Sequence, residues 1–190
     1  ASATKLREMN RNNENINDFI PYKLEDINCD IPYDISNLDS AIISKLRLMT
    51  AEDLQNISEV TEGIENRILS SANMSYSFET LVENVKNKRY TTSKIRRMII
   101  SALIDFTKNI YSPMPQYIRI LGMNKVGMTI LKQAKGICKV PIITKTADFK
   151  EQSPQFNLDV RATNIAMLCN PIPTHRIGNA DLKKSPIIMK

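Results

Sequence analysis

The sequence has few of the residues on which most enzyme and metal sites depend. It contains one histidine, His175, which excludes any catalytic motif or metal site that needs two. Its three cysteines are widely spaced and odd in number, so they form neither a disulfide framework nor a C-x-x-C metal site: Cys29, Cys138 and Cys169. We therefore expect no metal site, no catalytic residue in this chain and a reducing, cytoplasmic location.

Glycine-rich loops and long apolar runs are missing too. The five glycines are scattered, and no phosphate-binding G-x-x-x-x-G-K or G-x-G-x-x-G loop is present. No apolar run approaches the roughly 18 residues of a membrane span, and the first residues lack the apolar core of a signal peptide. We expect no membrane partner. The absence of an initiator Met and the abrupt helical opening suggest a fragment of a longer chain.

Positive charge is concentrated in one short stretch. The formal net charge is +6, from 26 basic and 20 acidic residues. Six cations lie between Asn84 and Leu103 with no acid among them: Lys86, Lys88, Arg89, Lys94, Arg96 and Arg97. Because these six equal the net charge, the rest of the chain is balanced. A local cationic cluster on a neutral background is typical of a protein with a polyanionic partner.

Apolar periodicity predicts a helix-rich first part. We expect a helix within 1–20 that Pro21 ends, a linker over 22–35, and a helix over 38–48 capped by Ser36 or Asn37. A capping box follows at 50–53, and further helices span 61–71 and 77–87. The clearest helix covers 92–109, because its apolar residues fall on one face: Ile95, Met98, Ile99, Ala102, Leu103 and Phe106. Its basic residues must then face solvent or a ligand.

The pattern changes after a proline-containing break at 112–115. Residues 117–122 and 140–144 are typical of strands, and the helix between them, over 124–137, has Val126, Ile130, Leu131 and Ala134 inward. This order predicts a parallel βαβ unit. A helix over 157–168 and a possible strand over 186–189 follow. The predicted fold class is helix-rich α/β, with a helical part at 22–111 and a small βαβ-containing part at 112–190.

Residues 86–97, here called the basic segment, combine a turn with the start of a helix. Backbone N–H groups, the hydroxyls of residues 91–93 and the cations would converge there on phosphate. Tyr90 could stack on an unpaired base. The competing interpretation is a solvated helix face without acids. We favour nucleic-acid contact through Lys86, Lys88, Arg89, Tyr90, Lys94, Arg96 and Arg97.

Other polar residues favour structural roles. Glu62, Glu65 and Asn66 share one side of a predicted helix, where an interaction with the helix dipole and a salt bridge to Arg67 are favoured over acid–base catalysis. His175 lies in a proline-rich tail and is expected at the surface. Asp159 and Arg161 point to different faces of their helix, so we expect each to meet a separate partner.

Several motifs resemble a known family. Ser2-Ala3-Thr4-x-x-Arg7, preceded by Ala1, is similar to the second signature of HIGH-type nucleotidyltransferases, usually I-S-S-T-x-x-R. Five more motifs follow in order: T-E-G-I-E-N-R-I at 61–68, K-R-Y-T at 88–91 with I-R-R at 95–97, Y-I-R-I-L-G at 117–122, P-I-I-T-K at 141–145 and D-V-R-A-T at 159–163. Together they resemble the C-terminal half of the bacterial tRNA(Met) cytidine acetate ligase family, over essentially the whole chain.

The resemblance implies an activity for the full-length enzyme. Family members use ATP to activate acetate as acetyl-adenylate and then acetylate N4 of the wobble cytidine of elongator tRNA-Met. Their ATP site lies mainly in an N-terminal nucleotidyltransferase domain, which this sequence lacks. Residues 1–21 would be its trailing helix, with Ser2, Thr4 and Arg7 on the matching positions for phosphate contact and Ala3 where the superfamily often has Ser.

The resemblance and the charge agree on tRNA. We expect a fragment that is inactive alone, binds no cofactor, and has tRNA and the missing N-terminal domain as partners, with residues 22–111 as the tRNA-binding part. Two alternatives stay open: a helix-turn-helix-like DNA-binding module and a helical scaffold for oligomerisation. Preference for folded tRNA over duplex DNA would distinguish the tRNA-binding part of a ligase from the DNA-binding module. The oligomerisation scaffold predicts no salt-dependent nucleic-acid binding.

Overall fold

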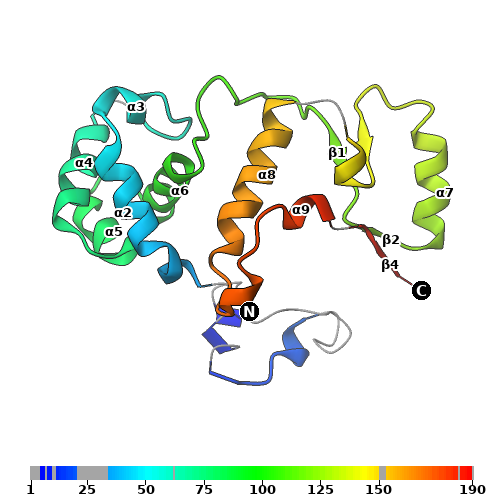
Figure 1. Ribbon diagram of the computed structural model, residues 1–190, viewed down its shortest axis with the longest axis horizontal. Coiled ribbons are helices and arrows are strands. Elements are labelled where there is room, and N and C mark those ends of the chain that lie inside the picture. The colour runs from blue at the N-terminus through cyan, green and yellow to red at the C-terminus, as the bar shows by residue number, and fades with distance from the viewer. Residues whose placement is uncertain are drawn as a thin grey trace.

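The computed structural model describes residues 5–6, 8–9, 12–20, 34–61, 63–149, 153–183 and 185–189. Helices α2 to α6 form a bundle, helix α8 stands beside it, and α7 with the short strands lies on the far side of α8 (Figure 1). This arrangement confirms the predicted fold class, a helix-rich chain with small parallel strands in its C-terminal part. Of the helices described, none has the length and apolar character needed to span a membrane.

The bundle holds the main hydrophobic core. Its helices are α2 (Asp39–Leu48), α3 (Ala51–Gln55), α4 (Glu65–Met74), α5 (Phe78–Val85) and α6 (Thr92–Leu103), preceded by the 3-10 helix η3 (Ile35–Leu38). Helix α2 packs against α4 and α6, and α5 packs against the same two. The fully buried side chains come from every one of these helices and their connections, including Leu46, Leu54, Ile68, Leu81, Ile95 and Ile99.

Local capping explains several helix starts. The predicted capping box joins Thr50 to Asp53, and a second joins Ser77 to Thr80.

Two predictions about helix starts were wrong. The side chain of Asp34, instead of Ser36 or Asn37, accepts a hydrogen bond at the start of η3. Helix α4 begins at Glu65 instead of residue 61, because the chain turns at Gly63 with φ of 89°, a conformation that a helix cannot contain.

Helix α6 ends at Leu103, well before the predicted residue 109. Asp105 takes the left-handed conformation with φ of 53°, and the N–H of Phe106 donates to the carbonyl of Ser101 at 2.8 Å. These are the features of a Schellman motif, which usually has glycine at the left-handed position. Because Asp105 occupies this position instead of glycine, no signal in the sequence marked the end of the helix here.

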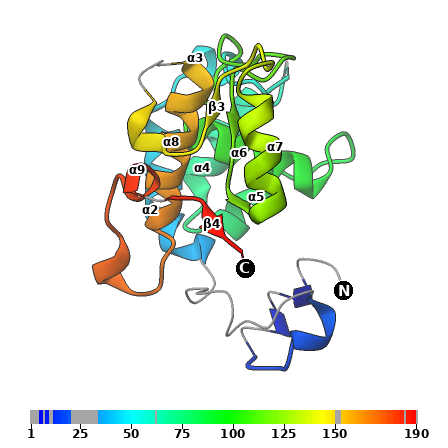
Figure 2. The ribbon, with the colours of Figure 1, turned by 90° about the vertical axis from the view of Figure 1, so that its right-hand side faces the viewer.

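The predicted βαβ unit is present in a shorter form. Strand β1 (Ile118–Arg119) pairs in parallel with β3 (Ile142–Ile143), and α7 (Lys125–Ala134) connects them. The predicted strand over 117–122 is divided, because β2 (Gly122–Met123) pairs instead with β4 (Ile187–Ile188) (Figure 1). Strand β4 leads to the C-terminus (Figure 2). The inward orientation predicted for Val126 and Ile130 was wrong, since they are 65% and 59% exposed.

Helix α8 (Pro154–Met167) links the two parts and ends near α9 (Ala180–Lys183). Arg161 donates to the carbonyl of Ile104 at 3.0 Å, and Asp159 accepts from the hydroxyl of Tyr117, so the prediction of separate partners is confirmed. Three short 3-10 helices complete the described elements: η1 (Asn17–Phe19), η4 (Thr146–Asp148) and η5 (Pro173–His175). Residues 12–20 lie below the bundle and α8 in Figure 1.

Candidate nucleic-acid interface

The basic segment begins in a tight turn between α5 and α6. The side-chain oxygen of Asn87 accepts from the N–H groups of Arg89 at 2.8 Å and Tyr90 at 3.0 Å. Thr91 then caps α6 by accepting from the N–H of Lys94. These local bonds hold Lys88 and Arg89 at the tip of an ordered turn, with both side chains exposed.

Arg67 of α4 holds the end of α5 that leads into the turn. Its guanidinium donates to three main-chain oxygens at the end of α5, with distances of 3.1 Å to Asn84, 2.8 Å to Val85 and 2.8 Å to Lys86. These carbonyls have no partner inside the helix, so the cation satisfies a helix C-terminus. Among the described residues Arg67 forms no ion pair with Glu65, the described one of the two predicted glutamates, and it fixes the position of the turn instead.

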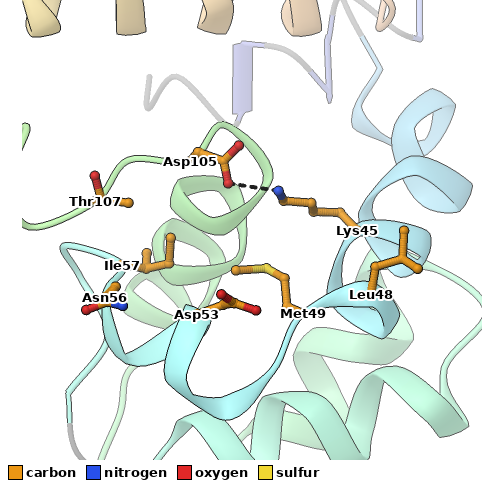
Figure 3. A pocket seen from close by; sticks show the side chains of 8 residues that line it. All are labelled: Lys45, Leu48, Met49, Asp53, Asn56, Ile57, Asp105 and Thr107. Atoms are coloured by element: carbon orange, nitrogen blue, oxygen red, sulfur yellow. Dashed lines mark ion pairs between the residues drawn. The ribbon is translucent and has the colours of Figure 1, made fainter.

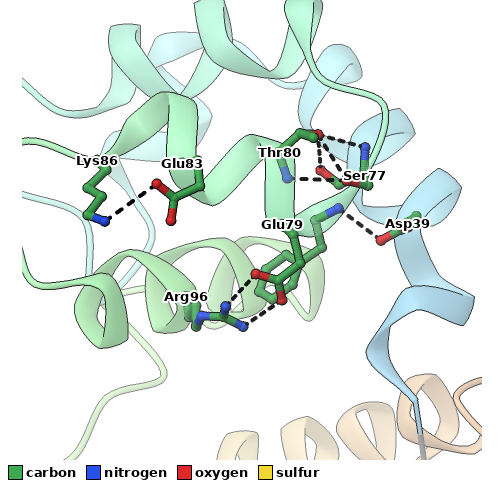
Figure 4. A network of polar contacts seen from close by, with 8 residues as sticks. Asp39, Ser77, Glu79, Thr80, Glu83, Lys86 and Arg96 are labelled. Carbon is green, nitrogen blue, oxygen red and sulfur yellow. Dashed lines mark hydrogen bonds and ion pairs between the residues drawn. The ribbon is translucent and has the colours of Figure 1, made fainter.

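Acids outside the basic segment pair with half of the six cations. Lys86 pairs with Glu83 at 3.4 Å, and Arg96 binds both carboxylate oxygens of Glu79 (Figure 4). Arg97 lies 3.6 Å from Glu59. Among the described residues, no carboxylate lies within ion-pair distance of Lys88, Arg89 or Lys94: their charges are the ones available to a polyanion.

Tyr90 has a packing role that the sequence did not predict. Its side chain is 8% exposed, and its hydroxyl lies 2.7 Å from that of Thr61. The Lys94 ammonium lies 5.0 Å from the ring centroid and the Arg89 guanidinium 5.4 Å from it. Stacking on a base needs an exposed ring face, so the stacking role predicted for Tyr90 is corrected: the ring positions the two cations.

Glu65 is a buried structural anion. Its side chain is 3% exposed, and one carboxylate oxygen accepts from Gln55 at 3.1 Å and from Asn66 at 3.4 Å. Hydrogen bonds from its own backbone N–H, and then from Gln55, lower the pKa of this carboxyl, so it stays ionised. Glu62 lies outside the described residues.

Three other predicted features have simple outcomes. His175 is exposed in η5, as predicted. Ser2, Thr4 and Arg7, the residues matched to an ATP signature, all lie outside the described residues. Across the described part of the chain, no group of three or more histidine, cysteine or acidic side chains could hold a metal ion.

A cavity of about 370 Å³ opens between α2, α3 and the segment after α6 (Figure 3). Asp53 and Asp105 line it together with one lysine, Lys45, whose ammonium lies 2.8 Å from Asp105. With two carboxylates against one paired cation, this cavity repels a polyanion.

A second cavity, which we call the Lys94 groove, has the opposite character. It has a volume of about 350 Å³ and is lined by Ser58, Glu59, Thr61, Lys94, Lys108 and Tyr111. Sequence reasoning missed Lys108 and Tyr111, because it placed Lys108 inside a helix over 92–109 and gave Tyr111 no role. The break at 112–115, which follows these residues, was the available sequence signal of a loop.

Comparison with known proteins shows the family to which the chain belongs. A family model described as HIGH Nucleotidyl Transferase matches residues 1–181. The chain is 33% identical to a tRNA(Met) cytidine acetate ligase of Thermosipho africanus over 100% of its own length and 52% of that protein. Against a ligase of the same name from Acetivibrio thermocellus, it is 33% identical over 78% of the chain and 38% of that protein.

A solved structure has the same fold. The crystal structure of Thermotoga maritima TmcAL bound with alpha-thio ATP aligns with a TM-score of 0.82 and 27% identity, covering 100% of this chain and 52% of that one. The chain thus spans about half the length of the relatives that it matches over its whole extent.

Proposed function

Because this chain belongs to the HIGH Nucleotidyl Transferase family and is related to tRNA(Met) cytidine acetate ligases, we propose that it is the tRNA-binding part of such a ligase. The observation that carries the proposal is the cationic tip formed by Lys88 and Arg89. Arg67 and Asn87 hold this tip in place, and its charges have no carboxylate partner among the described residues. Phosphate contacts of this kind supply much of the affinity of proteins for nucleic acids.

In this proposal the whole ligase activates acetate with ATP and transfers the acetyl group to N4 of the wobble cytidine of elongator tRNA-Met. Ser2, Thr4 and Arg7 would contact phosphate groups of ATP, and an N-terminal nucleotidyltransferase domain would supply the rest of that site. The domain would also be the chain's protein partner. A cytoplasmic location is part of the same proposal.

The proposal that catalysis requires the N-terminal domain has a test of its own. The 190-residue chain alone should not catalyse acetate-dependent exchange between ATP and pyrophosphate, because it holds one histidine and no phosphate-binding loop. Exchange above the no-enzyme background would contradict the assignment of catalysis to another domain.

Binding of an elongator tRNA-Met transcript, measured over a range of salt concentrations, tests the central claim. The affinity should fall steeply with salt, and the double variant Lys88→Gln/Arg89→Gln should lower the slope of log affinity against log salt by about 1.4 to 1.8. Lys132→Gln/Lys135→Gln, which removes two exposed lysines beyond α8, is the matched control. Equal affinity for duplex DNA would favour the DNA-binding alternative, and equal slopes for both double variants would reject this surface.

A further inference from the structure

We propose that the Lys94 groove binds one unpaired nucleotide of RNA, with its base on the ring of Tyr111 and its phosphate between Lys94 and Lys108. The inference rests on the proposed function, because a folded RNA supplies the nucleotide. It extends that function by assigning a base-stacking site and a phosphate site away from the turn at Lys88 and Arg89.

The floor of the groove is ordered by main-chain hydrogen bonds between two segments. The N–H of Ser58 donates to the carbonyl of Phe106, and the N–H of Lys108 donates to that of Asn56, both at 2.8 Å. An antiparallel bridge between Ile57 and Thr107 lies between these bonds. The segment that carries Glu59 and Thr61 and the segment that leads to Lys108 and Tyr111 are therefore held side by side.

Lys94 of helix α6 forms the other wall, and Tyr90 supports it from outside the lining. The buried ring of Tyr90 lies against the Lys94 ammonium at 5.0 Å, and its hydroxyl meets Thr61 at 2.7 Å. One aromatic side chain thus fixes both a cation and a hydroxyl of the lining. This contact explains why a tyrosine in the basic segment is buried instead of being offered to a base.

The groove combines the three groups that a single-stranded nucleotide requires. Tyr111 is 62% exposed and offers a ring for stacking. Lys94 and Lys108 supply positive charge for a phosphate, and the hydroxyls of Ser58 and Thr61 can bond base or ribose edges. Glu59, the one acid among the described residues of the lining, lies 3.6 Å from Arg97, so its charge is already countered.

Fluorescence of a short RNA that carries 2-aminopurine provides the direct test, because stacking quenches this base. The wild-type chain should quench it, and Tyr111→Leu should weaken binding about fivefold or more, as loss of one stacked base does. Tyr111→Phe should bind like wild type. Tyr76→Leu is the matched control, since Tyr76 is 82% exposed and outside the groove. An equal effect of the Tyr111→Leu and Tyr76→Leu variants would overturn the inference.

The lysines have a separate readout. Lys94→Gln and Lys108→Gln should each lower the salt slope for single-stranded RNA by about 0.7. Lys108→Gln is the safer variant for folding, because this side chain is exposed and Lys94 contacts Tyr90. Unchanged slopes for both variants would also overturn the inference.

The same set of variants separates this inference from the proposed function. If tRNA binds with the expected salt dependence but the groove variants behave like wild type, the groove is rejected and tRNA binding stands. If the short RNA binds through Tyr111 but tRNA binds no better than duplex DNA, the groove stands and the proposed tRNA-binding role fails. If free ATP binds at the groove but the short RNA does not, an RNA nucleotide is rejected as the occupant.

Discussion

The guanidinium of Arg96 is bound by both carboxylate oxygens of Glu79, at 2.9 and 2.5 Å, so that α6 and α5 are joined by a two-pronged ion pair. The same guanidinium lies 5.3 Å from the ring centroid of Phe78. The sequence predicts that Arg96 contacts a polyanion. In the structure, however, its charge is already paired with Glu79 within the bundle. The cations of the basic segment therefore differ in how available they are to a polyanion, because some of them are paired with carboxylates.

Arg96→Ala should lower the salt slope of tRNA binding by clearly less than Arg89→Ala, which should lower it by about 0.7 to 0.9. Glu79→Gln should act in the opposite direction, because it releases the Arg96 charge. Salt titrations of the three variants provide the measurement. Equal losses for the two arginine variants would show that tRNA displaces Glu79.

Tyr90→Ala should destabilise the chain by roughly 3 kcal/mol, because it removes a buried aromatic ring. Tyr90→Phe should cost about 1 kcal/mol, the usual value of one hydrogen bond, since only the contact with Thr61 is lost. Urea unfolding measures both. Tyr76→Ala, at an exposed tyrosine, serves as the control and should change stability by no more than about 0.5 kcal/mol.

Glu65 should make stability depend on acid pH. Its pKa is lowered in the folded chain by its own backbone N–H and by Gln55, so its stabilising contribution is present above the unfolded pKa of about 4.3 and is lost as the pH falls through the lower folded value. Glu65→Gln should flatten the stability profile in this range. Gln55→Ala should move the loss to higher pH. Parallel profiles for wild type and Glu65→Gln would contradict the prediction.

The exposed face of α7 should tolerate polar residues. Val126→Ser and Ile130→Ser should each change the free energy of unfolding by no more than about 0.5 kcal/mol, because these side chains are 65% and 59% exposed. Ile143→Ser, at a residue of β3 that is 3% exposed, should cost roughly 3 kcal/mol. Thermal unfolding of the three variants distinguishes this surface from the buried stripe that helical periodicity alone predicts.

Local hydrogen bonding could be read from the sequence where its partners are neighbours. The capping box at Thr50 and Asp53 and the cap at Ser77 depend on residues three positions apart, and the structure has both. The end of α6 could not be read in this way, because an aspartate occupies the left-handed position where a glycine would have marked it. The misplaced boundary put Lys108 inside a helix, whereas the structure has it in the loop after α6, where it lines the Lys94 groove.

The sequence by itself determined the helix-rich α/β fold class, the buried face of α6 and the concentration of cations in the basic segment, because periodicity and composition act over short stretches of chain. Only the tertiary structure decided which of those cations are free. Glu79 and Glu59 come from other elements, and Tyr90 is buried by its contact with Thr61 in a distant segment. Ion pairs and exposure depend on how the elements pack, and packing brings together residues whose relation no local pattern records.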